Sequence, residues 1–379
     1  MNVDGKHADE AEDIEKTTNE EPEPLAYPLD SLLIRTEQRT IQDVLRRIPD
    51  GVIKLDPDFQ REFLWDTDRQ SRLIESILMR IPLPVFYVAE DEEGKLVIVD
   101  GLQRLSTMRE FAEGRLTLGL RNPEIDGKNV KTLPPRYKRR FEDGQLLFYI
   151  IDARAPERVR LDVFERVNSG VALTRQQMRN ALYNGPATRL LRELSSSDVF
   201  KRATQSSLDK DQIRKEQRDR EVINRYLAFQ VLGWRSFGSP ERADMDEFLG
   251  QGLRVLNRQA QASGGANPDK APEVQDIRTR FALSMERNHR IFGRHAFCKH
   301  WNAEDRKHPF NVALFEVFSV LLGQYAAGRA ESADDAIRSG FYDLMSERRF
   351  ERSISAGTNK VESVRARFEL AEQMLRGVG

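Results

Sequence analysis

The hydrophobic positions divide the chain into an early stretch that mixes strands with helices and a long later stretch that is helical. Uninterrupted apolar runs at residues 96–99 and 146–151 predict buried strands. Apolar residues recur at helical spacing over residues 66–79 and over most of residues 157–376. The pattern therefore predicts an α+β protein, in which a small α/β domain is followed by a mostly α-helical domain.

Caps, turns and prolines place the individual elements. A short helix is expected at residues 40–48 and a strand at 51–55, while residues 85–88 and 95–99 flank an acidic turn and predict a hairpin. Another strand is expected at 145–152, after an insertion over 119–144. The helices expected later cover residues 157–167, 174–184, 186–195, 211–232, 241–261, 272–290, 311–325, 332–346 and 360–376.

Charge is distributed unevenly along a chain whose net charge is −1. Residues 1–24 carry nine acids and two lysines, a net −7, which leaves +6 on the remainder. This composition predicts a disordered acidic tail at 1–28, and the domains are then expected at 29–155 and 156–379. A single cysteine, a polar N-terminus and the lack of an apolar run long enough to span a bilayer predict a cytoplasmic protein that does not enter the membrane.

The richest candidate site is the sequence Asp100-Gly101-Leu102-Gln103-Arg104, which follows a buried strand and opens a helix. Glycine at such a turn allows close approach of the backbone to a ligand, and the new helix N-terminus favours anions. Arginine can hold a phosphate with two hydrogen bonds, and we expect Arg104 to be accessible. These residues predict a phosphate site, although an ordinary turn with a solvated arginine fits the same pattern.

Two further polar groups accompany this turn. Gln60 and Arg61 lie in a loop rich in aromatic residues, and Arg166 and Asn168 lie where one predicted helix ends before the next. Each group taken alone fits an ordinary loop or helix end, and spacing does not show that they meet.

Several motifs together give the sequence a family resemblance. They are Phe59-Gln60-Arg61 with Trp65, Ile81-Pro82-Leu83-Pro84, Asp100 to Leu105, Phe164 to Gly170, and Arg179-Asn180-Ala181. The sequence resembles the N-terminal domain of GmrSD-type, modification-dependent restriction endonucleases, a family with a ParB/sulfiredoxin-like core and a DGQQR motif. Weaker likeness continues through Asn311, Glu316, Ser353 to Thr358, and Arg367.

The resemblance implies a ParB-like domain that binds a nucleoside triphosphate and Mg²⁺. It implies catalytic roles for Asp100, Gln103 and Arg104, and nucleotide contacts from Gly101 and from the set Gln60, Arg61, Arg166 and Asn168; no residue is assigned as a protein metal ligand. Two positions depart from the family pattern: Leu102 stands in place of glutamine, and Gln177 in place of a glutamate. If that acid activates water, this chain should hydrolyse nucleotide slowly.

The resemblance further implies a subunit of a phage-defence system that hydrolyses NTP and couples it to DNA cleavage. The HNH nuclease pattern is not evident, so the nuclease is expected on a separate subunit. The sequence His295-x-x-Cys298-x-His300 lacks the second pair of a zinc site, and ordinary packing is favoured. The basic cluster Arg136–Arg140 is the preferred DNA contact, because acids alternate with the cations over 211–221.

Two alternatives remain open at this stage. One is a non-catalytic DNA-binding or adaptor protein that uses nucleotide as a switch, and the other is a stand-alone ParB-like DNA-nicking nuclease. The sequence also leaves open whether the chain forms a homo-oligomer, which base it prefers and which DNA modification is sensed.

Overall fold

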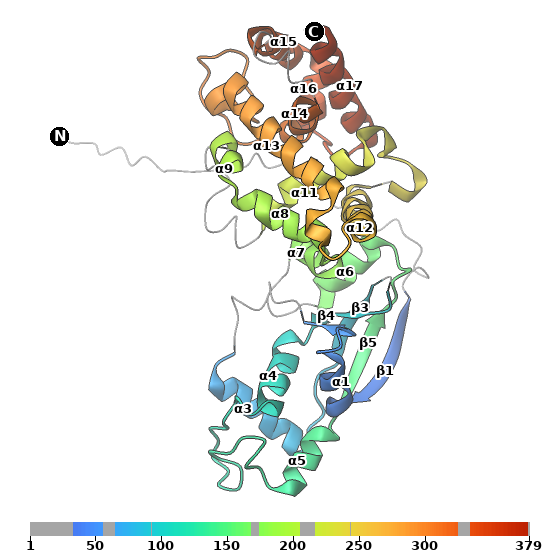
Figure 1. The fold of residues 1–379 in the computed structure, drawn as a ribbon, viewed down its shortest axis with the longest axis vertical. Coiled ribbons are helices and arrows are strands. Elements are labelled where there is room, and N and C mark those ends of the chain that lie inside the picture. Colours follow the sequence, from blue (N-terminus) through green and yellow to red (C-terminus); the bar gives the residue numbers. More distant parts are fainter. Residues whose placement is uncertain are drawn as a thin grey trace, which may run out of the picture. The chain divides into compact units, whose positions relative to one another are not determined.

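The structure is a computed structural model, which describes residues 33–55, 65–91, 93–167, 174–204, 217–242, 244–324 and 334–377. It divides into two compact units, with the boundary between Leu182 and Tyr183 (Figure 1). The two helices that follow the last strand therefore belong with the sheet, whereas the sequence pattern places the boundary at 155/156. Among the described residues, every helix is too short or too polar to cross a bilayer.

The first unit is built on a five-stranded mixed sheet with the order β1-β5-β3-β4-β2. The strands are β1 (Ile34–Thr40), β2 (Ile53–Lys54), β3 (Phe86–Glu90), β4 (Leu96–Asp100) and β5 (Gln145–Ile151). Strands β3 and β4 form the expected antiparallel hairpin, and β3 also runs parallel to β5. Together with the helical second unit, this sheet confirms the α+β class.

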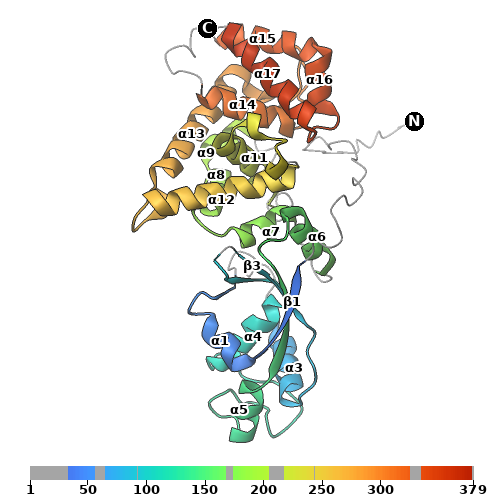
Figure 2. The same ribbon diagram turned by 90° about the vertical axis from the view of Figure 1, so that its right-hand side faces the viewer.

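In the described part of this unit, six helices accompany the sheet. They are α1 (Ile41–Arg47), α3 (Thr67–Leu78), α4 (Leu102–Ala112), α5 (Pro135–Glu142), α6 (Glu157–Val167) and α7 (Arg175–Leu182). Alternate strand residues such as Val88 and Ile150 share one core with α1, α3, α4 and α5, which gather beside the strands (Figures 1 and 2). Val97 and Val99, on the other face of β4, are also buried, and α7 packs against this strand. Burial on both faces explains the uninterrupted apolar run.

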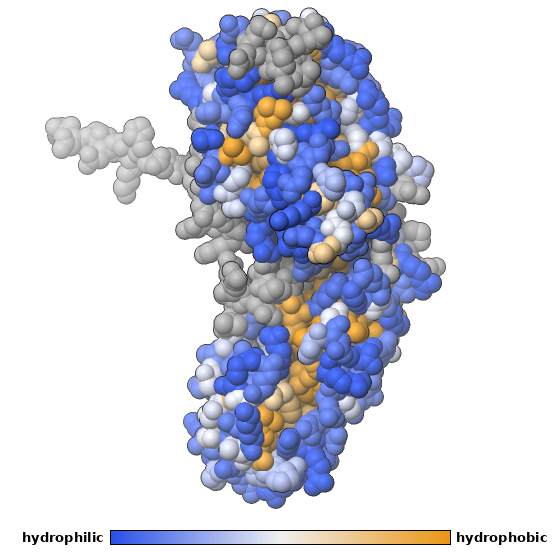
Figure 3. Space-filling model, in the orientation of Figure 1, coloured by the Kyte–Doolittle hydropathy of each residue, from blue (hydrophilic) through white to orange (hydrophobic). Residues whose placement is uncertain are grey.

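Two elements of this unit were not expected from the hydrophobic pattern. Strand β1 has the polar sequence IRTEQRT and pairs along its whole length with β5. It lies at the sheet edge, where Arg35 bonds Glu90 at 2.8 Å. Helix α5 lies within the segment expected to be an insertion with turns, and it buries only Phe141. On the face drawn in Figure 3, apolar residues form a strip over this unit between hydrophilic flanks.

The second unit is helical. Its α-helices are α8 (Pro186–Ser196), α9 (Asp198–Thr204), α11 (Arg218–Leu232), α12 (Met245–Ser263), α13 (Pro272–Phe292), α14 (Val312–Gln324), α15 (Asp334–Ser346), α16 (Arg348–Ser355) and α17 (Val361–Gly377). All residues of α14 from Ala313 to Gly323 are buried, because α11, α13, α16 and α17 pack around it. The short helices α9 and α16 are additions to the expected set.

The centre of the helical unit contains a buried acid shared by two arginines. Glu316 on α14 bonds Arg225 of α11 at 2.7 Å and is paired with Arg367 of α17. Arg367 also donates to the carbonyl oxygen of Thr358 at 2.6 Å, and Asn311 donates to that of Ile354 at 2.9 Å. The C-terminal residues that carry the weaker family likeness therefore meet in one polar network inside the fold.

Candidate phosphate-binding turn

The turn between β4 and α4 requires glycine. Gly101 has φ of 102° and is the N-terminal cap of α4. A Cβ atom there would lie 2.3 Å from Cδ1 of Phe86, a ring with no exposed surface. L-residues rarely adopt this backbone conformation, and the buried Phe86 ring occupies the space that a Cβ atom would need. Both the backbone and the packing therefore favour glycine.

The N-terminus of α4 has two features that favour an anion. Gly101 provides no capping side chain, and the first turn of the helix contains no acidic residue. The first N–H groups of an α-helix have no intrahelical partner and carry a partial positive charge. This turn can therefore donate backbone hydrogen bonds to phosphate oxygens.

Arg104 is buried, and the expectation that it would be accessible is wrong. The residue is 8% exposed, and its guanidinium lies 4.2 Å from the centre of the Phe86 ring. It donates to the carbonyl oxygens of Pro84 and of Val85, the latter at 3.0 Å, and to Oδ2 of Asp100 at 2.9 Å. Burial lowers the pKa of Arg104, and the carboxylate of Asp100 opposes that shift. No sequence pattern pointed to Phe86 or to the two carbonyl groups as partners of Arg104.

The remaining polar groups of the turn are better exposed. The side chain of Asp100 is 38% exposed, so Arg104 holds one oxygen of a carboxylate that still faces solvent. Oε1 of Gln103 accepts a hydrogen bond from the backbone N–H of Trp65 at 3.3 Å, which ties the start of α3 to α4. Leu102 stands where the motif of the resembled family has glutamine. Its apolar side chain packs against the core, so this difference leaves no polar group buried there.

The other predicted site residues lie apart from this turn or outside the described residues. Gln60, Arg61 and Asn168 are not among the described residues. Arg166 is exposed in the last turn of α6, and no ion pair joins it to another described residue. The structure thus brings together Asp100, Gly101, Gln103 and Arg104. It shows no hydrogen bond or ion pair between Arg166 and this turn, and the three residues outside its described ranges remain predictions.

Gln177 has a structural role at the start of α7. Its Oε1 accepts from the backbone N–H of Thr174 at 2.8 Å, and its own N–H donates to Oγ1 of Thr174 at 3.2 Å. This reciprocal pair is a capping box, which glutamine and glutamate form equally well. A glutamate at this position would form the same capping box.

A buried ion pair joins α7 to α6, and a buried hydrogen bond lies within α7. Arg179 and Glu157, which are almost completely buried, lie 3.8 Å apart, and Gln176 donates to Asn180 at 2.8 Å. Of these residues, Arg179 and Asn180 belong to the resemblance: Arg179 pairs with Glu157 of α6, and Asn180 accepts a hydrogen bond within α7.

The histidine cluster of the second unit is packed among aromatic rings. His295 and His300 stack with their ring centres 4.9 Å apart, and Phe341 lies 4.6 Å from His300. Nδ1 of His300 lies 2.9 Å from the carbonyl oxygen of Cys298. Burial lowers the pKa of His300 to about 4. Within the described ranges, no group of three or more metal-ligating side chains is found.

The basic cluster Arg136–Arg140 is partly neutralised. Arg136 forms an ion pair with Glu124 at 2.7 Å, and Arg140 donates to the carbonyl oxygen of Leu78 at 3.3 Å. The cluster borders a groove of about 790 Å³, which is lined by its arginines together with Arg80 and apolar residues such as Ile81 and Leu83. DNA contact through this cluster therefore stays a prediction.

One protein-family model matches most of the first unit. Residues 41–184 match the model described as "GmrSD restriction endonuclease, N-terminal domain". The segment belongs to that family. The matched range contains the Asp100–Arg104 turn and ends beside the unit boundary at Leu182. No curated protein and no solved structure matches the chain. A GmrSD N-terminal domain indicates a component of a restriction or phage-defence system.

Proposed function

We propose that the GmrSD domain binds the triphosphate of a nucleotide at the Asp100–Arg104 turn and hydrolyses it, as the NTP-dependent component of a restriction system. The observation that carries this proposal is the uncapped N-terminus of α4, which opens beside the half-exposed carboxylate of Asp100. Backbone N–H groups at a glycine turn donate to phosphate oxygens without any side chain in between.

The residues present fit a magnesium nucleotide. Mg²⁺ commonly takes one or two protein carboxylates and completes its shell with phosphates and waters. Asp100 supplies one such carboxylate, and its bond to Arg104 fixes the carboxylate orientation. When bound, the ion neutralises phosphate charge. Gln103, which already holds Trp65, lies in the first turn of α4 next to the space where the phosphates bind.

The roles of Arg104 and Asp100 differ in this proposal. Arg104 is a positioning residue, because its guanidinium bonds two carbonyl groups and the Asp100 carboxylate. Asp100 is the group that faces the ligand, and it is the candidate to accept a proton from attacking water. The buried guanidinium also favours a second candidate function, a nucleotide-dependent switch without turnover, since Arg104 is not turned outward to stabilise transition-state charge.

The test is calorimetric titration of the full chain with ATP, GTP, CTP and UTP, with and without Mg²⁺. Asp100→Asn keeps an acceptor for Arg104 but removes the charge, and Asp50→Asn is the matched control, at an exposed position of the same unit. We expect one or more NTPs to bind, with Mg²⁺-dependent affinity about 10- to 100-fold weaker in Asp100→Asn and unchanged in Asp50→Asn.

Phosphate release at saturating NTP then separates the two candidate functions. Turnover by the wild type that is lost in Asp100→Asn supports hydrolysis, and binding without turnover supports the switch. If no NTP binds, or if Asp100→Asn binds as tightly as the wild type, the nucleotide site is not at this turn.

A further inference from the structure

The cleft between α16 and α17 is lined by five exposed cations. It has a volume of about 810 Å³, and its positively charged residues are Arg348, Arg349, Arg352, Lys360 and Arg365. Two acids, Glu362 and Glu369, also line it, and only Arg349 pairs with one of them, at 3.3 Å. The cleft therefore keeps a surplus of positive charge that the fold does not neutralise.

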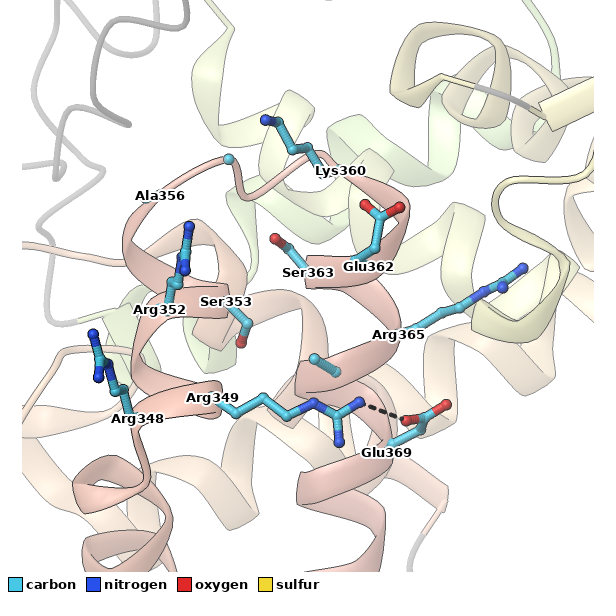
Figure 4. Close-up of a pocket in the computed structure, with 12 residues that line it drawn as sticks. Arg348, Arg349, Arg352, Ser353, Ala356, Lys360, Glu362, Ser363, Arg365 and Glu369 are labelled. Carbon is cyan, nitrogen blue, oxygen red and sulfur yellow. Dashed lines mark hydrogen bonds and ion pairs between the residues drawn. The ribbon is translucent and has the colours of Figure 1, made fainter.

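Three of these cations are available to a ligand. No ion pair and no side-chain hydrogen bond joins Arg348, Arg352 or Lys360 to another residue in the described part of the chain. Arg348 and Arg352 lie one helical turn apart along α16, and Lys360 stands at the start of α17 (Figure 4). The three side chains thus present charge along the length of the cleft.

The floor of the cleft is made of small residues. Ser353, Ala356, Gly357, Ser363 and Ala366 line it between the basic side chains. Small side chains allow a sugar–phosphate backbone to approach the helices closely. A peptide partner would need apolar pockets for anchoring side chains, and this lining contains no large apolar residue.

We infer that the α16–α17 cleft binds the phosphate backbone of double-stranded DNA. Arginine suits phosphate because its planar guanidinium donates two parallel hydrogen bonds, and contacts of this kind fix a duplex without reading its sequence. This inference goes beyond the nucleotide site, which lies in the other unit, and its test needs no nucleotide. The two proposals can therefore fail independently.

The experiment measures fluorescence anisotropy of a labelled 30-base-pair duplex of mixed sequence, titrated with the full-length protein at several salt concentrations. The variant is Arg348→Ala/Arg352→Ala/Lys360→Ala. The control is Arg202→Ala/Lys270→Ala/Arg306→Ala, which removes the same charge at three exposed sites of the same unit that have no ion pair within its described residues. Thermal unfolding checks that both variants fold.

We expect the wild type to bind DNA with an affinity that falls steeply with salt. Each lost phosphate contact lowers the slope of log K against log[salt] by about 0.9, so the cleft variant should lose about 2–3 units of slope and roughly 100-fold in affinity at 0.1 M salt. The control should keep nearly the wild-type slope. The inference is overturned if the wild type does not bind the duplex, if the cleft variant binds like the wild type, or if the control loses as much.

Discussion

The Gly101→Ala substitution tests whether the glycine turn is as constrained as its geometry indicates. A residue with a side chain in the left-handed region costs about 1–2 kcal/mol. At Gly101, φ is 102° and the new methyl carbon would also lie 2.3 and 2.7 Å from two carbons of the buried Phe86 ring. Crowding a packed core costs about 1–3 kcal/mol more, so the total destabilisation should be about 2–5 kcal/mol.

Gly94→Ala is the matched control, because Gly94 has φ of 76° but its added methyl would meet no atom within 4 Å. It should lose only the backbone cost of about 1–2 kcal/mol. For a unit of this size, 1 kcal/mol lowers Tm by about 2–4 °C, so thermal unfolding followed by circular dichroism separates the two variants. Equal Tm values for Gly101→Ala and Gly94→Ala would refute the claim that the Phe86 ring closes this turn.

Three further predictions concern individual side chains. Arg104→Ala should destabilise the GmrSD domain by roughly 3 kcal/mol, because it leaves the Asp100 carboxylate and two carbonyl groups without their donor; urea unfolding that matches the wild type would contradict this. Gln177→Glu should keep the capping box and leave the rate of phosphate release unchanged, whereas a rise in rate would show that an acid there activates water. Burial lowers the pKa of His300 to about 4, so between pH 6.5 and 4 the unfolded chain binds a proton that the folded chain does not, and the free energy of unfolding should fall by roughly 3 kcal/mol over this range. Urea titrations at each pH should show a smaller dependence on pH for His300→Phe, and an unchanged dependence would assign the effect to other groups.

Hydrophobic patterning predicted the elements that bury apolar side chains. The β3–β4 hairpin, β5 and the long helices follow from it, since each has an apolar face or run. Strand β1 escaped prediction because its residues are polar and its position depends on pairing with β5, a partner about a hundred residues away. Helix α16, with eight residues, was also missed.

The residues of the candidate turn were predicted from the sequence, but the groups that surround them in the fold were not. Residues adjacent in sequence, such as Asp100 and Gly101, necessarily share one turn. The burial of Arg104 could not be predicted, because it depends on the ring of Phe86 and on two carbonyl groups that precede β3. The capping role of Gln177, by contrast, could have been predicted, because Thr174-x-x-Gln177 is the sequence signature of a capping box.

The shared acid at the centre of the helical unit has a consequence for how this unit is made. Arg225 precedes Glu316 by 91 residues, and Arg367 follows it by 51. A growing polypeptide that has released α14 but not yet α17 holds Glu316 with only one of its two cations, and burying an incompletely paired carboxylate is costly. The helical unit should therefore not fold stably during synthesis until Arg367 has left the ribosome, because only then can Glu316 pair with both arginines.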